Sequence, residues 1–171
     1  MPKNAIDTIY DRRSIRKYLD KEVNPDLVQE VLRAGMFAPS AANKQPYHFI
    51  VFDNKEKIAQ IKEIHPYAKT LETAPICIMV CGDIQQQMAE GFYICDCSAV
   101  CENILLAAEA LGLNTCWMGI YPWKELTDNM AKFLDLPDNV KPFAIIALGY
   151  GAVDLPRAKR FDETKIHYNN W

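Results

Sequence analysis

The sequence predicts a single globular domain in which helices and strands are combined. Its 171 residues are enough for one sizeable core, and 50% of them are hydrophobic, as in soluble folded proteins. Some apolar residues recur three and four positions apart, which is typical of helices, whereas others form short continuous runs, which are typical of buried strands. We therefore expect one domain over residues 1–171, without repeats, linkers or low-complexity segments.

The composition argues against several classes of partner. The chain contains 19 Lys and Arg residues and 22 Asp and Glu residues, and its net charge is −3. Such a charge gives no general attraction to nucleic acid or to an anionic membrane. No apolar run approaches the roughly 20 residues that span a bilayer, and the N-terminus lacks the apolar segment of a signal peptide. We expect a cytoplasmic protein.

Asparagine residues mark the first two helices. Asn4 can cap a short helix that begins at Ala5. Asn24 followed by Pro25 is typical of a helix start, and the apolar spacing that follows predicts a helix that Pro39 ends. The segment between these two helices is therefore expected to be short and extended.

Residues 11–18, which read Asp-Arg-Arg-Ser-Ile-Arg-Lys-Tyr, form that segment and suit an anion. In an extended chain the side chains alternate between faces, so Arg12, Ser14 and Arg16 project from one side and Arg13 projects from the other. Planar guanidinium groups and a hydroxyl match the oxygens of a phosphate group. Because the net charge of the chain is slightly negative, this cationic cluster is local, and it predicts a phosphate-bearing ligand.

Residues 39–46 combine small residues with two side-chain amides between two prolines. Their backbone could approach a flat ligand closely while Asn43 and Gln45 offer hydrogen bonds. The same residue types populate ordinary turns, and a turn is the favoured interpretation when these residues are considered alone. For His48 and Lys69, structural and solvated roles are likewise favoured over catalysis and anion binding.

The rest of the chain alternates between predicted strands and helices. Apolar runs predict three buried strands, at residues 47–52, 76–81 and 143–148. Helical spacing predicts three further helices, at residues 55–64, 92–111 and 123–134. The first of these strands should be buried on both faces toward its end. The longest helix is apolar nearly all round, so we expect its own sheet to cover one side and a second subunit to cover the other.

Gly112 ends the longest helix, and a strand-like connection follows it. Within this connection Gly119 permits close approach of the backbone to a ligand, and Trp117 offers a broad aromatic face. Core packing is the alternative role for Trp117 and is slightly favoured. The sequence contains neither a Gly-x-Gly-x-x-Gly motif nor a P-loop motif.

Six cysteines, at positions 77, 81, 95, 97, 101 and 116, invite a metal or disulfide interpretation. Cys97 and Cys101 would share one face of a helix, whereas Cys95 and Cys97 would diverge, and no CxxC pair occurs. All six lie within apolar segments. We therefore expect buried free thiols and no metal site.

The C-terminal segment is first basic and then aromatic. The basic residues at 157–160 can be interpreted as a solvated extension. Ile166, Tyr168 and Trp171 follow at a spacing near two residues, which predicts an extended arm with one buried face.

Five segments carry a joint signal that none of them carries alone. They are Arg-Arg-Ser-Ile-Arg at 12–16, Ala-Pro-Ser-Ala-Ala-Asn-Lys-Gln-Pro-Tyr-His-Phe at 38–49, Gly-Leu through Trp-Met-Gly at 112–119, Leu-Gly-Tyr at 148–150 and Pro-Arg-Ala-Lys-Arg-Phe at 156–161. Their order and spacing, over nearly the whole of a short chain, resemble the nitroreductase family of FMN flavoproteins.

The resemblance implies an α+β fold, with a central, mainly antiparallel sheet flanked by helices, and an intertwined homodimer with two FMN sites at the subunit interface. It also implies an NAD(P)H-dependent oxidoreductase that reduces its FMN and passes electrons, in a ping-pong scheme, to a nitroaromatic, a quinone or a similar flat acceptor. Because the flavin carries the chemistry, no side-chain nucleophile is implied. Two alternatives remain: an FMN-binding carrier or sensor module without turnover, and a cysteine-based metal protein, which the helix-face geometry disfavours.

By position, the resemblance also implies cofactor contacts. Arg12, Ser14 and Arg16 would hold the phosphate and ribityl region of FMN. Arg13 would lie at the pyrimidine edge of the flavin or at the ribityl chain, where its charge would stabilise the anionic reduced flavin and raise its potential. The other implied contacts are Pro39, Ser40, Ala41 and Asn43 from the other subunit, Met118 and Gly119 near flavin N5, and the cations Lys69, Lys159 and Arg160.

Overall fold

A four-stranded antiparallel sheet forms the centre of the structure, a computed structural model that describes residues 4–171. The strands lie in the order β1-β2-β4-β3, and their bounds are β1 Tyr47–Phe52, β2 Ile76–Asp83, β3 Asn114–Gly119 and β4 Val140–Gly149. Every neighbouring pair is antiparallel. This arrangement confirms the predicted sheet, and β3 is the strand that the sequence marked only as a connection.

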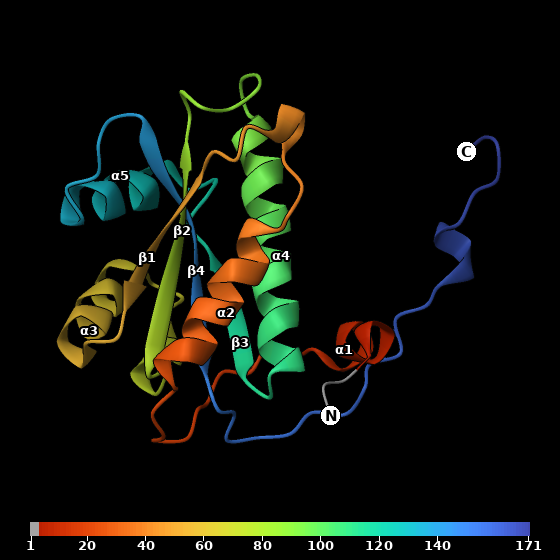
Figure 1. The fold of residues 1–171 in the computed structure, drawn as a ribbon, viewed down its shortest axis with the longest axis horizontal. Coiled ribbons are helices and arrows are strands. Elements are labelled where there is room, and N and C mark those ends of the chain that lie inside the picture. Colours follow the sequence, from red (N-terminus) through yellow and green to blue (C-terminus); the bar gives the residue numbers. More distant parts are fainter. Residues whose placement is uncertain (1–3) are drawn as a thin grey trace.

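Helices cover both faces of the sheet (Figure 1). The helices are α1 Ala5–Asp11, α2 Pro25–Met36, α3 Lys55–Ile64, α4 Phe92–Ala110 and α5 Lys124–Phe133, and the short 3-10 turns are η1 Ala41–Asn43, η2 Lys69–Glu72 and η3 Glu163–Lys165. Figure 1 shows α2 and α4 on one face and α3 and α5 on the other. Within the part of the chain that the structure describes, no helix is both long enough and apolar enough to cross a membrane.

The predicted helix starts are confirmed at the level of single hydrogen bonds. The side-chain oxygen of Asn4 accepts from the N–H of Asp7 at 2.9 Å, and that of Asn24 accepts from the N–H of Asp26 at 2.9 Å. Each asparagine therefore satisfies a backbone donor that the first turn of its helix leaves without an intrahelical partner. Just after the C-terminal end of α4, Gly112 adopts a φ of 77°, a conformation that glycine reaches without steric cost.

The sheet separates two hydrophobic cores because alternate residues of a strand face opposite sides. Strand β2 is buried along its whole length. Its residues Ile78 and Val80 belong to the core beneath α2 and α4, whereas Cys77 and Met79 belong to the core beneath α3 and α5. Both faces of the central strands therefore exclude water, which is why these strands are continuous apolar runs in the sequence.

Two expectations about burial are wrong. Strand β1 is not buried on both faces toward its end, because Val51 is 39% exposed while Phe52 is buried. The reason is that β1 is an edge strand and lies at the margin of the helical layers. Cys95 is exposed, whereas the other five cysteines are buried free thiols as expected. Its position on α4 directs it away from the face that carries Cys97 and Cys101.

The C-terminal arm, residues 152–171, leaves the body of the molecule and extends past α1 (Figure 1). Ile166, Tyr168 and Trp171 are 44%, 81% and 99% exposed. The predicted arm is present, but its predicted buried face does not form within one chain, because none of the described residues 4–171 forms a second layer against it. Near its start the arm is attached to α1 by Arg157, whose Nη2 lies 2.9 Å from Asp7 and 2.8 Å from Asp11.

Candidate active site

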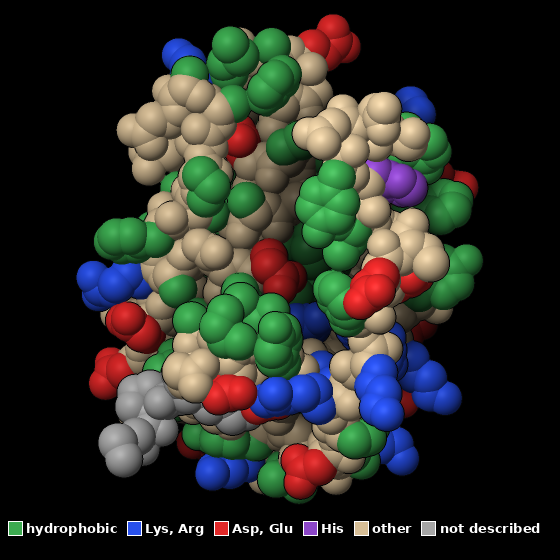
Figure 2. Space-filling model, turned by 90° about the vertical axis from the view of Figure 1, so that its right-hand side faces the viewer, with side chains coloured by type: hydrophobic (Ala, Val, Ile, Leu, Met, Phe, Trp, Pro, Cys, Tyr) green, Lys and Arg blue, Asp and Glu red, His purple; other side chains and the backbone are tan. Residues whose placement is uncertain are grey.

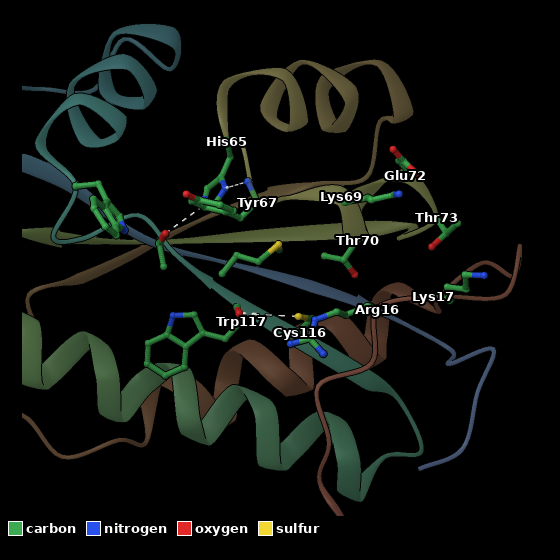
Figure 3. Close-up of a pocket in the computed structure, with 13 residues that line it drawn as sticks. Arg16, Lys17, His65, Tyr67, Lys69, Thr70, Glu72, Thr73, Cys116 and Trp117 are labelled. Carbon is green, nitrogen blue, oxygen red and sulfur yellow. Dashed lines mark hydrogen bonds between the residues drawn. The ribbon is translucent and has the colours of Figure 1, made fainter.

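A cavity of about 650 Å³ opens beside the outer edge of β3 (Figure 3). Its wall is formed by residues 16–17, by parts of residues 65–73, by the second half of β3 and by Trp123. These segments come from three separate parts of the chain. The volume lies within the range of about 300–1,000 Å³ that is typical of small-molecule sites.

The backbone of β3 supplies one wall of this cavity. On its inner side β3 pairs with β4. On its outer side the carbonyl of Thr115 accepts from the N–H of Ile15 at 2.9 Å, next to the isolated bridge between Ser14 and Thr115. Because backbone groups two residues apart in a strand point the same way, those of Trp117 and Gly119 also face outward. The cavity is therefore bordered by a peptide edge that can exchange hydrogen bonds with a flat ligand.

Positive side chains line the end of the cavity nearer the N-terminal segment. Arg16, Lys17 and Lys69 all reach it (Figure 3). The Nη1 of Arg16 lies 3.4 Å from the carbonyl of Ser14, which turns the guanidinium toward the β3 edge. Glu72 is the one acidic residue on the wall. The cationic end therefore favours a ligand that carries negative charge or electron-rich oxygens.

His65 closes the cavity at the other end of the exposed β3 edge. It is only 2% exposed, and its Nε2 lies 3.0 Å from the carbonyl oxygen of Gly119. Its Nδ1 accepts from the N–H of Tyr67 at 3.2 Å. No signal in the sequence marks His65 as a site residue, because the pair His65-Pro66 indicates only the end of a helix.

The thiol of Cys116 also lines the cavity, but its environment makes it a poor nucleophile. Burial raises the pKa of Cys116, and the nearby charge of Arg16 only partly opposes this. Burial likewise raises the pKa of Cys77 and of Cys81 to about 12. A thiolate is the reactive form of cysteine, so these side chains are protonated near neutral pH and act as apolar packing groups.

Four of the cofactor contacts implied by the sequence meet in this cavity: Arg16, Lys69, Met118 and Gly119. The structure thus brings together residues up to about a hundred positions apart in the sequence. Trp117 lies at the boundary between the cavity and the core. It lines the cavity, and it packs against Phe143 with ring centroids 6.0 Å apart.

The other cationic candidates of the N-terminal segment lie outside the cavity. Arg12 is placed toward α4, where its Nε lies 3.7 Å from Glu102. Arg13 turns back on the end of α1, and its guanidinium donates to the carbonyls of Tyr10 at 2.8 Å, Arg12 at 2.7 Å and Pro156 at 3.1 Å. Carbonyls at a helix C-terminus attract a cation, and this explains the orientation of Arg13.

The loop that contains Pro39, Ser40, Ala41 and Asn43 also lies outside this cavity, at the end of α2. It adopts unusual backbone conformations, with φ of 49° at Ala42 and 53° at Asn43. Ser40 stabilises it, because its Oγ accepts from the N–H of Gln45 at 2.9 Å. Lys159 and Arg160 are exposed on the C-terminal arm. A single chain therefore assembles only part of the implied cofactor contacts.

Comparison with known proteins identifies the family. The sequence model described as the Nitroreductase family matches residues 9–69 and 64–150. The chain belongs to the nitroreductase family. A protein of Methanothermobacter thermautotrophicus with the provisional name NADH dehydrogenase/NAD(P)H nitroreductase is 40% identical over 168 residues, which cover 98% of this chain and 88% of that protein.

Solved structures of nitroreductases agree with this assignment. A crystal structure from Bacteroides thetaiotaomicron, with the same provisional name, is 38% identical, covers 100% of both chains and gives a TM-score of 0.93. A provisionally named nitroreductase from Desulfovibrio desulfuricans, solved in complex with FMN, is 29% identical, covers 100% of this chain and 99% of its own, and gives a TM-score of 0.84. The nitroreductase fold is thus shared over the entire chain.

In this nitroreductase the donor set of the cavity suits FMN. The isoalloxazine ring is flat and carries carbonyl oxygens and ring nitrogens along its edges, which the β3 peptide edge and the cations Arg16 and Lys69 can address. A metal site is a poorer match. Among residues 4–171 no three His, Cys, Asp or Glu side chains are grouped so that they could hold a metal ion.

Proposed function

We propose that the protein is an FMN-dependent NAD(P)H oxidoreductase that passes electrons, in a ping-pong scheme, to a nitroaromatic, a quinone or a similar flat acceptor. The observation that carries this proposal is the cavity beside β3, which Arg16 and Lys69 line together with the exposed peptide edge that ends at Gly119. The membership of the nitroreductase family and the FMN complex of the Desulfovibrio desulfuricans relative support it.

FMN, when bound, supplies hydride transfer between the nicotinamide and the acceptor. The side chains of the protein bind it and set its electrostatic environment. Arg16 and Lys69 line the cavity and would place positive charge beside the electron-rich edge of the bound ring, where it would favour the anionic reduced form. They take the role that the sequence analysis gave to Arg13, whose guanidinium is directed at main-chain carbonyls outside the cavity. The backbone of Met118 and Gly119, which lines the cavity, would border the reacting edge of the bound ring.

The phosphate end requires residues from elsewhere. In this proposal Arg12 and Ser14, from the segment that pairs with β3 at Thr115, would hold the phosphate together with Lys159 and Arg160 from the C-terminal arm. In this proposal Pro39, Ser40, Ala41 and Asn43 contact the flavin from a second copy of the chain.

A homodimer with two FMN sites follows from this proposal, and exposed apolar side chains support it. Ile6, Ile9 and Tyr10 of α1 are 57%, 49% and 53% exposed, and Phe161 of the arm is 81% exposed. The face of the molecule on this side shows hydrophobic side chains around a central hollow (Figure 2). Burying such side chains against a second subunit removes apolar surface from water.

A visible spectrum tests the proposal directly. The purified protein should be yellow, or should become so when FMN is added, and anaerobic NADH or NADPH should bleach the flavin absorbance. Addition of a quinone should then restore the absorbance. A bound flavin that neither nucleotide bleaches would favour the carrier or sensor role instead. A colourless protein that FMN cannot reconstitute would refute the proposal.

A further inference from the structure

His65 is placed where helix α3 ends and the cavity wall begins, and it is buried although it lines the cavity. Both of its ring nitrogens have a backbone partner. One partner is the N–H of Tyr67, two residues further on, and the other is the carbonyl of Gly119, at the end of β3. The ring therefore links the loop after α3 to the strand that borders the cavity.

The partners of the ring identify its tautomer. The N–H of Tyr67 can only donate, so Nδ1 of His65 must present its lone pair at 3.2 Å. In the neutral ring the proton then resides on Nε2, which donates to the carbonyl of Gly119 at 3.0 Å. A protonated ring could not accept from Tyr67. The geometry therefore requires a neutral His65 with a defined orientation.

Gly119 is the residue of β3 that most needs such a partner. The N-terminal segment pairs with the outer edge of β3 only at Thr115, so Gly119 lies beyond the reach of that pairing. Beyond Gly119 the chain leaves the strand, and the N–H groups of Ile120 and Tyr121 both point at the carbonyl of Phe143, each at 3.0 Å. Glycine has more backbone freedom than any other residue. The N–H of Ile120 holds the inner side of the peptide group that follows Gly119, and the bond from His65 to the Gly119 carbonyl holds its outer side.

The orientation of Gly119 matters because its C=O and its N–H lie on the same, outward side of the strand. The C=O belongs to the peptide group that follows Gly119, and the N–H belongs to the one that precedes it. The bond from His65 fixes the first of these groups, and it thereby restricts the rotations through which the N–H could turn away from the cavity. A larger residue with less backbone freedom would be crowded at position 119, because a Cβ added to Gly119 would lie 3.3 Å from the carbonyl oxygen of Tyr121. The close packing favours glycine, and the histidine compensates for its freedom.

We propose that His65 is a positioning residue that fixes the peptide of Gly119 at the flavin-facing edge of β3, a role that rests on the proposed function. His65 does not contact the reacting atoms in this role and transfers no proton. It acts through Gly119, by helping to hold the N–H of Gly119 in the direction from which that N–H would donate to the edge of the ring. Preorganised donors of this kind cost no reorganisation when the ligand binds.

Two variants and one control separate this role from a merely structural one. His65→Leu keeps an apolar body of similar size and removes both hydrogen bonds. His65→Gln keeps an amide that can donate to Gly119. Asn54→Ala is the control, because Asn54 caps the opposite end of α3 through the N–H groups of Glu56 and Lys57 and lies outside the cavity. Loss of such a cap lowers stability without changing the cavity wall.

The first readout uses the FMN-free protein and requires no activity. The ¹⁵N–¹H signal of Gly119 should shift in His65→Leu. The amide of Ile120, which shares a peptide group with the Gly119 carbonyl and donates to the carbonyl of Phe143, should exchange with solvent at least about tenfold faster, because the bonds that hold this peptide group are weakened. Neither change should occur in Asn54→Ala. His65→Gln should exchange within about threefold of the unmodified protein. An unchanged Gly119 signal in His65→Leu would overturn the proposal.

The second readout is the dissociation constant of FMN, measured by quenching of flavin fluorescence. We expect His65→Leu to weaken binding about tenfold and His65→Gln to restore most of it, whereas Asn54→Ala should bind as the unmodified protein does. Equal losses in His65→Leu and His65→Gln would overturn the proposal. If the unmodified protein itself binds no FMN, the proposed function fails, while the Gly119 signal of the FMN-free protein still decides the role of His65.

Discussion

The carboxylate of Asp96 in α4 accepts a hydrogen bond from the backbone N–H of Ala41, with Oδ1 2.9 Å from the nitrogen. This bond ties the loop after α2 to the first turns of α4. Asp96 is only 4% exposed, and its second oxygen, Oδ2, is buried with no hydrogen-bond partner among the described residues. The protein therefore retains an incompletely satisfied carboxylate, and it does so at the loop that carries Ser40 and Asn43.

We expect Asp96→Ala to lower the free energy of unfolding by about 1–2 kcal/mol, because it leaves the half-buried N–H of Ala41 without its acceptor. It should also weaken FMN binding, since in the proposed dimer this loop contacts the flavin of the other subunit. Denaturant unfolding and FMN titration measure the two effects. Asp96→Asn is the matched control. Its amide oxygen can still accept from Ala41 and the buried charge is removed, so its stability should change by less than about 0.5 kcal/mol.

A different outcome would identify another role for Asp96. If Asp96→Asn loses as much FMN affinity as Asp96→Ala while its stability is unchanged, the negative charge itself, and not the position of the loop, contributes to binding. In that case the unpaired Oδ2 would accept from a donor of the second subunit or of the ligand.

Arg16 and Arg13 make a matched pair for testing the electrostatics of the cavity. An exposed guanidinium several ångströms from the flavin contributes about 1–3 kcal/mol to the difference between its oxidised and anionic reduced forms. Arg16→Ala should therefore lower the midpoint potential by about 30–60 mV for a two-electron couple. Arg13→Ala should leave the potential unchanged, because its guanidinium bonds to the carbonyls of Tyr10 and Pro156 instead.

Equilibration with a redox dye measures both potentials. The assignment of Arg16 would be refuted by an unchanged potential in Arg16→Ala together with a lowered potential in Arg13→Ala. That pattern would return the role to Arg13, as the sequence analysis expected.

A feature can be predicted from the sequence when the residues that interact to form it lie close together along the chain. Asn4 and Asn24 were identified correctly as caps because a cap bonds to a backbone group two or three residues away. The central strands were identified because burial on both faces leaves a continuous apolar run. The burial of Val51 was predicted incorrectly because a local window does not indicate which strand lies at the edge of the sheet.

The site follows the same rule. The local alternation argument put Arg12, Ser14 and Arg16 on one side, but only Arg16 lines the cavity, and Arg12 is turned toward Glu102 of α4. The direction of Arg13 depends on Pro156, which lies 143 residues further along the chain. The bond between His65 and Gly119 spans 54 residues, and no motif accompanies it. Family resemblance supplied Met118 and Gly119 as a pair, whereas only coordinates could show that a histidine holds one of them.

Acid stability should depend on Asp83, at the end of β2. Burial raises the pKa of this carboxyl, but hydrogen bonds from Asn139, Gln85 and Gln86 outweigh the burial and hold the pKa below its ordinary value. The N–H of Gln85 and the Nε2 of Gln86 donate to it at 2.8 and 3.0 Å. A carboxyl whose pKa is lower in the folded state stabilises the protein above the pKa of the unfolded chain, and the stabilisation is lost as the pH falls through the folded value.

Asp83→Asn should therefore be less stable than the unmodified protein at pH 7, and the difference should be constant down to about pH 5 and shrink below about pH 4. Urea unfolding at a series of pH values measures this. Asp53→Asn, at an exposed position after β1, is the control and should show no such convergence. Parallel curves for Asp83→Asn and the unmodified protein at all pH values would contradict the assignment.

Removal of the C-terminal arm tests the proposed dimer. The arm exposes Phe161, Tyr168 and Trp171, which are 81%, 81% and 99% exposed in one chain. Burial of such aromatic side chains against a partner stabilises the dimer by about 25 cal/mol for each Å² of apolar surface removed from water. The unmodified protein should therefore sediment at about twice the chain mass of 19.5 kDa, and a chain that ends at residue 151 should sediment nearer to the mass of one chain.

The same truncation removes Lys159 and Arg160, so its effects on assembly and on the cofactor must be separated. The double variant Lys159→Ala and Arg160→Ala should remain a dimer, because it keeps the aromatic side chains, yet it should bind FMN at least about tenfold more weakly through loss of two phosphate contacts. The loss should shrink for riboflavin, which has no phosphate. If the double variant binds FMN as tightly as the unmodified protein while the truncated chain does not, the arm acts through assembly alone and the phosphate contacts lie elsewhere.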